Sequence, residues 1–110
     1  MYSVIDRETL KSKLDSGEEL HLVEVLSEQE FNRLHIAGAE HLNFKQVTRG
    51  ARDRFNQDDT IVVYCADRDC SASSTAAEKL DAVGFTNVYD YEEGKKDWQR
   101  AGYPMEGEEA

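Results

Sequence analysis

The sequence has few cysteines, a single proline and no long hydrophobic run among its 110 residues. None of its apolar stretches approaches the roughly 18 residues that a membrane-spanning helix needs, so neither a membrane protein nor a membrane partner is expected. The first residues, Met1 to Asp6, lack the basic and apolar regions of a secretory signal. These absences predict a cytoplasmic protein.

Basic residues are also scarce in this chain. It has 13 Lys and Arg against 23 Asp and Glu, which gives a formal net charge of −10. Such a surface repels nucleic acid and anionic lipid, so no nucleic-acid partner is expected. The length suits one domain and is too short for two ordinary ones. We expect one domain over residues 1–105 and a mobile acidic tail over residues 106–110.

The two cysteines, Cys65 and Cys70, are too close in sequence to act as a strong structural crosslink. The three histidines form no zinc-ligand pattern with them, so neither a metal nor another cofactor is expected. A nucleophilic or redox role fits the pair better. The simpler alternative is that both cysteines are only small hydrophobic residues buried in the core.

Short β-rich segments alternate with segments of helical periodicity, which favours a parallel sheet with helices on its faces. The expected strands cover residues 2–5, 20–26, 39–42, 60–64 and 87–91. Two helices are expected to begin after the N-caps Asp6 and Ser27. Further helices are expected over residues 44–55, 72–83 and 94–101.

Cys65 directly follows the clearest strand, residues 60–64, and a helix is expected to begin about six residues later. Ligands of open parallel sheets bind beyond the carboxyl ends of the strands. The unpaired N–H groups at the start of the following helix stabilise negative charge, which lowers the pKa of a nearby thiol. Cys65 is therefore the candidate nucleophile.

Four segments resemble the rhodanese family, in the family's own order. Residues 64–80 resemble its signature, in which a loop that starts at a cysteine enters an Ala-rich helix. Residues 22–31 resemble its Asp-Val-Arg strand and the acidic helix start that follows. Residues 34–39 resemble its Gly-His-Ile-Pro-Gly-Ala turn, and residues 84–104 its last strand and its Gly-Gly-x-x-x-Trp-x-x-Ala-Gly-Tyr-Pro ending.

The resemblance implies an α/β fold, a doubly wound five-stranded parallel sheet with helices on both faces. It also implies that Cys65 accepts a sulfane sulfur as a persulfide and passes it to a nucleophile. The bound sulfur would lie in a loop whose backbone N–H groups surround it. That loop comprises Ala66, Asp67, Arg68, Asp69, Cys70 and Ser71.

The chain departs from the family pattern inside this loop. Cys70 stands where the family usually has the arginine that binds anions such as thiosulfate, and Arg68 is the only cation of the loop. The negative charges of Asp67 and Asp69 would tend to raise the pKa of the Cys65 thiol. We therefore expect a polysulfide or a protein persulfide, rather than thiosulfate, as donor, and a thiol as acceptor. Cys70 is either a resolving thiol for Cys65 or simply a small residue at a helix start.

Other departures affect residues for which structural roles are expected. Glu24 and Leu26 replace the Asp and Arg of the family strand, and Leu34 and Ala37 replace a Gly and the Pro of the turn. These changes predict altered packing rather than lost chemistry. His35 is expected to be a structural histidine with its hydrogen bonds satisfied.

The main functional hypothesis is a sulfurtransferase or sulfur carrier that uses Cys65. A related cysteine phosphatase would need an arginine to bind a phosphate dianion, and the chain has Cys70 and Ser71 at the relevant positions. Arsenate reduction by the two cysteines is less firmly excluded. The alternative from another class is a non-catalytic interaction or redox-regulatory module.

Overall fold

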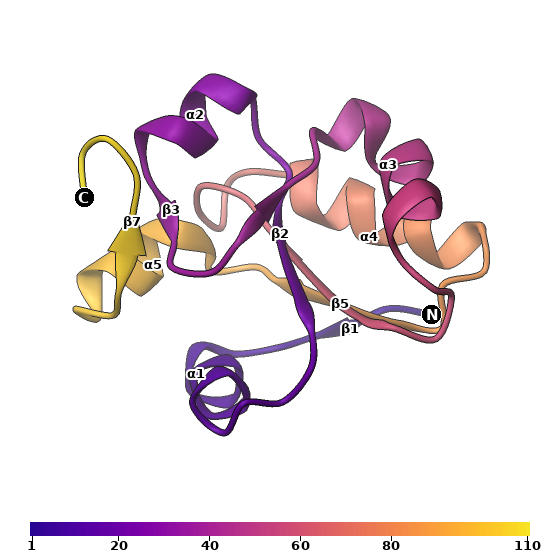
Figure 1. Ribbon diagram of the computed structural model, residues 1–110, viewed down its shortest axis with the longest axis horizontal. Helices are drawn as coiled ribbons and strands as arrows, with labels where there is room; N and C mark the ends of the chain where they lie inside the picture. The colour runs from indigo at the N-terminus through magenta and orange to yellow at the C-terminus, as the bar shows by residue number, and fades with distance from the viewer.

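The computed structural model describes all residues from 1 to 110 and places five strands in one parallel sheet (Figure 1). The strands are β1 (Ser3–Val4), β2 (His21–Glu24), β3 (His35–Ile36), β4 (Glu40–His41), β5 (Thr60–Tyr64), β6 (Asn87–Tyr91) and β7 (Met105–Glu106). The helices are α1 (Arg7–Asp15), α2 (Glu28–Arg33), the 3₁₀ helix η1 (Phe44–Gln46), α3 (Val47–Arg54), α4 (Ala72–Ala82) and α5 (Gly94–Arg100).

The parallel sheet has the strand order β1-β6-β5-β2-β4, so β5 lies at its centre. In the register of β5 and β6, Val63 is opposite Asp90. This arrangement confirms the expected doubly wound five-stranded sheet. A second, two-stranded antiparallel sheet of β3 and β7 was not expected from the sequence.

Successive residues of β5 point to opposite faces of the sheet and enter two separate cores. Ile61, Val63 and Cys65 belong to the core beneath α3 and α4. Val62 and Tyr64 belong to the core beneath α1 and α5, which also contains the buried Trp98. Figure 1 shows α3 and α4 on one side of the sheet and α1 on the other. Helices on both faces confirm the expected layering.

Local capping signals set the start of several helices. The Asp6 carboxylate accepts a hydrogen bond from the Thr9 amide at 2.8 Å, and the Ser27 hydroxyl accepts one from the Glu30 amide at 3.1 Å. The single helix expected over residues 44–55 is wrong in its first turn. Asn43 caps the tighter 3₁₀ turn η1, and the Gln46 backbone, with φ −122° and ψ 12°, interrupts the helix before α3.

The end of the chain packs against α2. β7 spans Met105–Glu106, so the expected boundary between residues 105 and 106 lies inside a strand. Beyond it, the amides of Glu108 and Glu109 donate to the carbonyl groups of Asn32 and Arg33 at 3.0 and 2.9 Å. The mobility expected for residues 106–110 stays a prediction. None of the helices has the length and apolar character to cross a membrane.

Candidate functional site

Cys65 lies at the carboxyl end of the central strand, where the sequence places the candidate nucleophile. Its side chain is only 1% exposed. Its Sγ atom lies 3.3 Å from the Cys70 carbonyl oxygen and 3.5 Å from the Ser73 hydroxyl oxygen. The sulfur is thus surrounded by the loop of residues 66–71 and the first turn of α4.

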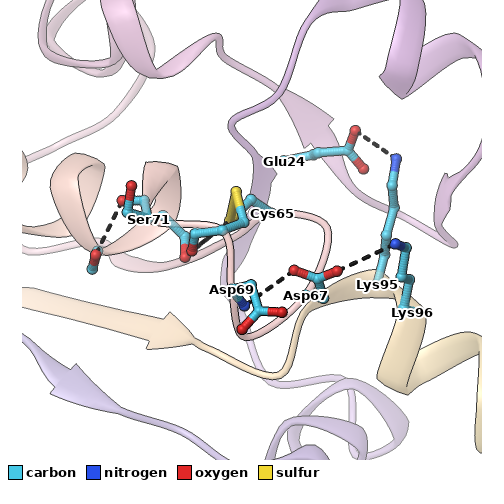
Figure 2. The surroundings of a disulfide bond; sticks show 10 residues. Glu24, Cys65, Asp67, Asp69, Ser71, Lys95 and Lys96 are labelled. Atoms are coloured by element: carbon cyan, nitrogen blue, oxygen red, sulfur yellow. Dashed lines mark hydrogen bonds and ion pairs between the residues drawn. A yellow bond between two sulfur atoms is a disulfide. The ribbon is translucent and has the colours of Figure 1, made fainter.

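Cys65 and Cys70 are joined by a disulfide bond (Figure 2). Their Cα atoms are 6.4 Å apart, within the range that a disulfide spans. The two sulfurs therefore meet without movement of the backbone. The structure brings together the two cysteines that the sequence singles out, and it shows the oxidised state of the pair.

The loop between the cysteines leaves several backbone donors unused. Asp67 fixes the conformation of the loop through two hydrogen bonds. The Asp67 side chain accepts one from the Asp69 amide at 3.1 Å, and the Asp67 carbonyl group accepts one from the Cys70 amide at 3.2 Å. Other backbone N–H groups of the loop have no acceptor within the chain, namely those of Ala66, Asp67, Arg68 and Ser71. The first N–H groups of α4 are likewise free of backbone partners. Such donors suit an anionic sulfur.

The start of α5 supports the same loop from the opposite side. The amides of Lys95 and Lys96 donate to the carbonyl oxygens of Cys65 and Ala66, each at 3.0 Å. Gly94 has a φ of +76°, and a Cβ atom at this position would lie 2.6 Å from the Ala66 carbonyl carbon. Only glycine allows this close approach, so Gly94 fixes the position of the loop.

The charges of the loop are mostly paired with α5 and the residue before it. The Lys96 ammonium group lies 3.2 Å from Asp67 and donates a hydrogen bond that lowers the pKa of this carboxyl group. Arg68, the only loop cation, forms an ion pair with Glu93. Arg68 is thus already engaged, whereas Asp69 has no ion pair.

A hollow of about 150 Å³ opens beside the loop, and we call it the loop hollow. Cys70 lines it, whereas Cys65 does not. Three carboxylates and one arginine contribute to its walls. The full lining comprises Arg68, Asp69, Cys70, Ser71, Ser73, Ser74, Asp90 and Glu92.

Four of these residues were not predicted from the sequence, namely Ser73, Ser74, Asp90 and Glu92. Ser73 is 2% exposed and Asp90 is 1% exposed. Neither oxygen of the Asp90 side chain has a hydrogen-bond partner. Burial raises the pKa of Asp90 from 3.8 to about 6, although the nearby Ser73 hydroxyl lowers it in part and the charge of Glu92 raises it further. The sequence does contain a signal for the burial of Asp90. Alternate residues of β6 share one face of the sheet, and Asp90 lies two residues after Val88 on the buried face.

A buried ion pair between Glu24 and Lys95 lies to one side of the loop (Figure 2). The Lys95 ammonium group donates to Glu24 at 3.0 Å and to the Leu34 carbonyl oxygen at 2.6 Å. The Tyr64 hydroxyl donates to the other Glu24 oxygen at 2.9 Å and accepts from the Ile36 amide at 3.1 Å. Glu24 therefore has a structural role, as expected, but its partner Lys95 was not predicted.

His35 also has structural contacts. Its Nδ1 atom lies 2.7 Å from the Phe31 carbonyl oxygen, and its ring stacks on that of Phe31 with centroids 3.9 Å apart. No group of three or more His, Cys, Asp or Glu side chains is arranged to hold a metal ion.

Comparison with known proteins identifies the family. The rhodanese-like domain family matches residues 6–101. The Vibrio cholerae protein named thiosulfate sulfurtransferase GlpE is 30% identical over 86 residues, which are 78% of this chain and 78% of GlpE. The Bacillus subtilis protein YrkF, named as a sulfur carrier, is 31% identical over 94 residues, 86% of this chain. This chain spans about half of YrkF, because the match covers 49% of it.

Solved structures agree with this assignment. The solution structure of the rhodanese-like domain of the Anabaena protein Alr3790 superimposes with a TM-score of 0.89 at 28% identity. The match covers 99% of this chain and 82% of the Anabaena domain. Sequence and fold therefore agree, and the chain belongs to the rhodanese-like domain family.

Proposed function

We propose that the chain is a sulfurtransferase or sulfur carrier that holds a sulfane sulfur as a persulfide on Cys65. The observation that carries this proposal is the position of Cys65, at the carboxyl end of β5 and within disulfide reach of Cys70. The unused N–H groups of the 66–71 loop and of α4 support it, because they can stabilise a thiolate or a persulfide anion.

The proposed transfer balances without an added oxidant. The Cys65 thiolate attacks the outer sulfur of a donor R–S–SH, so that Cys65–S–SH forms and R–S⁻ leaves. An acceptor thiolate then attacks the outer sulfur of the persulfide and releases Cys65 as a thiolate. Alternatively, the Cys70 thiolate attacks the Cys65 sulfur, which forms the disulfide and releases HS⁻. A dithiol reductant would then reduce the Cys65–Cys70 disulfide to two thiols.

The charges of the site favour a polysulfide or a protein persulfide as donor over thiosulfate. Asp69, Asp90 and Glu92 line the loop hollow, and Arg68 is paired with Glu93. A thiosulfate dianion would meet these carboxylates with no free cation in the loop. The name of GlpE describes that protein, and in our proposal it does not fix the donor of this one.

Mass spectrometry of the reduced protein after incubation with polysulfide tests the proposal. Cleavage after Arg68 places the two cysteines on separate peptides. We expect one added sulfur on the Cys65 peptide, no loading in Cys65→Ser, and slower release of the sulfur in Cys70→Ser. Ser74→Ala is the matched control, since Ser74 lines the same hollow. Loading that persists unchanged in Cys65→Ser would contradict the proposal.

The disulfide favours a second candidate, a redox-regulatory module without transfer activity. In that case Cys65 would cycle between thiol and disulfide and would take up no sulfur from any donor. A panel of thiosulfate, polysulfide and protein persulfide separates the two candidates. No persulfide with any of the three donors, together with reversible disulfide formation, would favour the redox module.

A further inference from the structure

The two sulfurs of the Cys65–Cys70 disulfide differ in how open they are to another molecule. Cys65 is only 1% exposed and does not line the loop hollow. Cys70 is partly exposed and forms part of the wall of this hollow. A thiolate breaks a disulfide by attacking one of its two sulfurs, and access decides which sulfur is attacked. The hollow therefore directs a thiol reductant to Cys70 and not to Cys65.

Attack on Cys70 also releases a sulfur that the chain can stabilise. The attack breaks the disulfide and leaves Cys65 as a thiolate. Several backbone N–H groups of the loop of residues 66–71, which begins directly after Cys65, have no acceptor within the chain. Such donors stabilise a thiolate, and a thiolate that is better stabilised leaves faster. Access and leaving-group stability thus favour the same direction of attack.

The charge of the hollow indicates which thiols can enter it. Asp69, Asp90 and Glu92 line the hollow, and none of their carboxylates forms an ion pair with a side chain of this protein. Arg68 is the only cation in the lining, and it is paired with Glu93. The hollow therefore repels an anionic thiol and attracts a cationic one.

The Asp90 carboxyl group is the feature that indicates a ligand. It is 1% exposed, and neither of its oxygens has a hydrogen-bond partner. A buried carboxylate without partners is costly, and in native proteins it marks a functional role or a bound ion. Burial raises the pKa of Asp90 to about 6, so this group is ionised at the pH of about 8 at which thiols react readily. A cation held in the hollow would offset this charge.

We propose that the loop hollow is a binding site for a cationic thiol, a small reductant that carries an ammonium group and attacks the Cys70 sulfur. The hollow volume of about 150 Å³ suits a molecule of a few non-hydrogen atoms, since one water molecule occupies about 30 Å³. Positive charge and a reactive thiol on one short carbon chain would bring the attacking sulfur next to Cys70.

The reaction balances with the reductant alone. The thiolate R–S⁻ attacks the Cys70 sulfur, the bond between the two protein sulfurs breaks, and Cys65 leaves as a thiolate. The reductant sulfur is oxidised and the Cys65 sulfur is reduced, so R remains on Cys70 as a mixed disulfide. A second thiolate, from another molecule or from the same dithiol, then attacks the R sulfur and releases Cys70 as a thiolate. The use of this reaction to restore Cys65 for sulfur transfer rests on the proposed function.

Mass spectrometry after a brief reaction identifies the sulfur that is attacked. The oxidised protein is mixed with cysteamine, a thiol that carries an ammonium group, and the reaction is stopped with acid at the earliest time points. Free thiols are then alkylated with N-ethylmaleimide, and cleavage after Arg68 separates the two cysteines. We expect cysteamine on the Cys70 peptide and the alkyl group on the Cys65 peptide, at least about tenfold over the reverse pattern. The same reaction in urea, where both sulfurs are open, should show no more than about a twofold difference.

A second measurement tests the preference for positive charge. Rates of disulfide loss with cysteamine and with the anionic mercaptoethanesulfonate are measured at pH of about 8 and low salt, and each rate is expressed per thiolate. Their ratio is divided by the same ratio for hydroxyethyl disulfide, a small uncharged disulfide, which removes the intrinsic reactivities of the two thiols. We expect the protein to favour cysteamine by at least about tenfold. Salt of about 1 M should abolish most of this preference.

Charge variants of the hollow and a matched control locate the source of the preference. Asp69→Asn combined with Asp90→Asn should lower it at least about threefold. Glu19→Gln is the matched control and should keep it. Glu19 is exposed and precedes β2, so it lies at the opposite end of the sheet from the loop.

Three results would overturn the proposal. They are a mixed disulfide that forms mainly on Cys65, equal normalised rates for the two thiols, and a preference that falls as much in Glu19→Gln as in the double variant. Neither measurement contains a sulfur donor. A failure to load persulfide on Cys65 would therefore count against the proposed function and leave these results intact.

Discussion

Replacement of Lys95 by Met should destabilise the protein more than any other change to a charged side chain of α5. Lys95 and Glu24 have side chains 4% and 0% exposed, and their charged atoms are 3.0 Å apart. The substitution leaves Glu24 buried with only the Tyr64 hydroxyl as a partner. Removing one partner of a buried ion pair costs about 3–5 kcal/mol, because the remaining charge has no compensation.

This cost should depend on pH in a defined direction. Burial raises the pKa of Glu24, and the charge of Lys95 lowers it only in part, so the pKa is raised overall. Without Lys95 the pKa must rise further. At a pH between the Glu24 pKa of the unfolded protein and that of the folded protein, the folded protein binds more protons than the unfolded one. Stability therefore falls as the pH rises through this range. The penalty of Lys95→Met should therefore be smaller at pH of about 5 than at pH of about 7.

Urea unfolding, followed by the fluorescence of the single and buried Trp98, measures the effect. Lys96→Met is the matched control, since it removes a neighbouring lysine whose ion pair with Asp67 is largely exposed and should cost at most about 1 kcal/mol. Adding Glu24→Gln to Lys95→Met should recover much of the loss. A Lys95→Met penalty that is no larger than that of the control, or that does not change with pH, would refute the reasoning.

Three further changes have defined outcomes in unfolding experiments. Asp90→Asn should raise the free energy of unfolding at neutral pH by up to about 3 kcal/mol, because a pKa shift from 3.8 to about 6 favours the neutral carboxyl group in the folded state. This gain should vanish below pH of about 4, where the Asp90 carboxyl group is neutral in both states. A loss of stability in urea unfolding would contradict this prediction. Gly94→Ala should lower stability by about 2–4 kcal/mol in thermal unfolding, since its Cβ atom would lie 2.6 Å from Ala66 and its φ is +76°. Reduction of the Cys65–Cys70 disulfide, which closes a loop with a sequence separation of 5, should cost no more than about 2 kcal/mol in urea.

Much of the fold could be predicted because its signals are local. The five parallel strands follow apolar β-rich segments, and Asp6 and Ser27 cap helices as their side chains predict. The antiparallel pair of β3 and β7 could not be predicted, because two residues in each strand carry no periodic pattern. The break before α3 depends on a tertiary contact as well, since the Phe44 amide donates to the Val25 carbonyl oxygen at 2.9 Å.

The candidate site could be predicted only where it is continuous in sequence. Cys65 and the loop up to Ser71 form one segment between a strand and a helix, so their proximity follows from chain order. Asp90 reaches the site through the pairing of β6 with β5, which no local pattern specifies. Lys95 is at the start of a helix in sequence, where a lysine is usually solvated, and only the fold shows that it is buried against Glu24.

The two buried carboxyl groups of this sheet, those of Glu24 and Asp90, differ in the partners that surround them. Glu24 is partly compensated by Lys95 and Tyr64, and these contacts join β2, β5 and α5. Asp90 has no such compensation, and the one hydroxyl beside it also contacts the Cys65 sulfur. Burial raises the pKa of both carboxyl groups, but only Glu24 has a cation within reach that offsets part of this rise. This difference supports a structural role for Glu24, and it explains why loss of the Asp90 charge should stabilise the protein whereas loss of Lys95 should destabilise it.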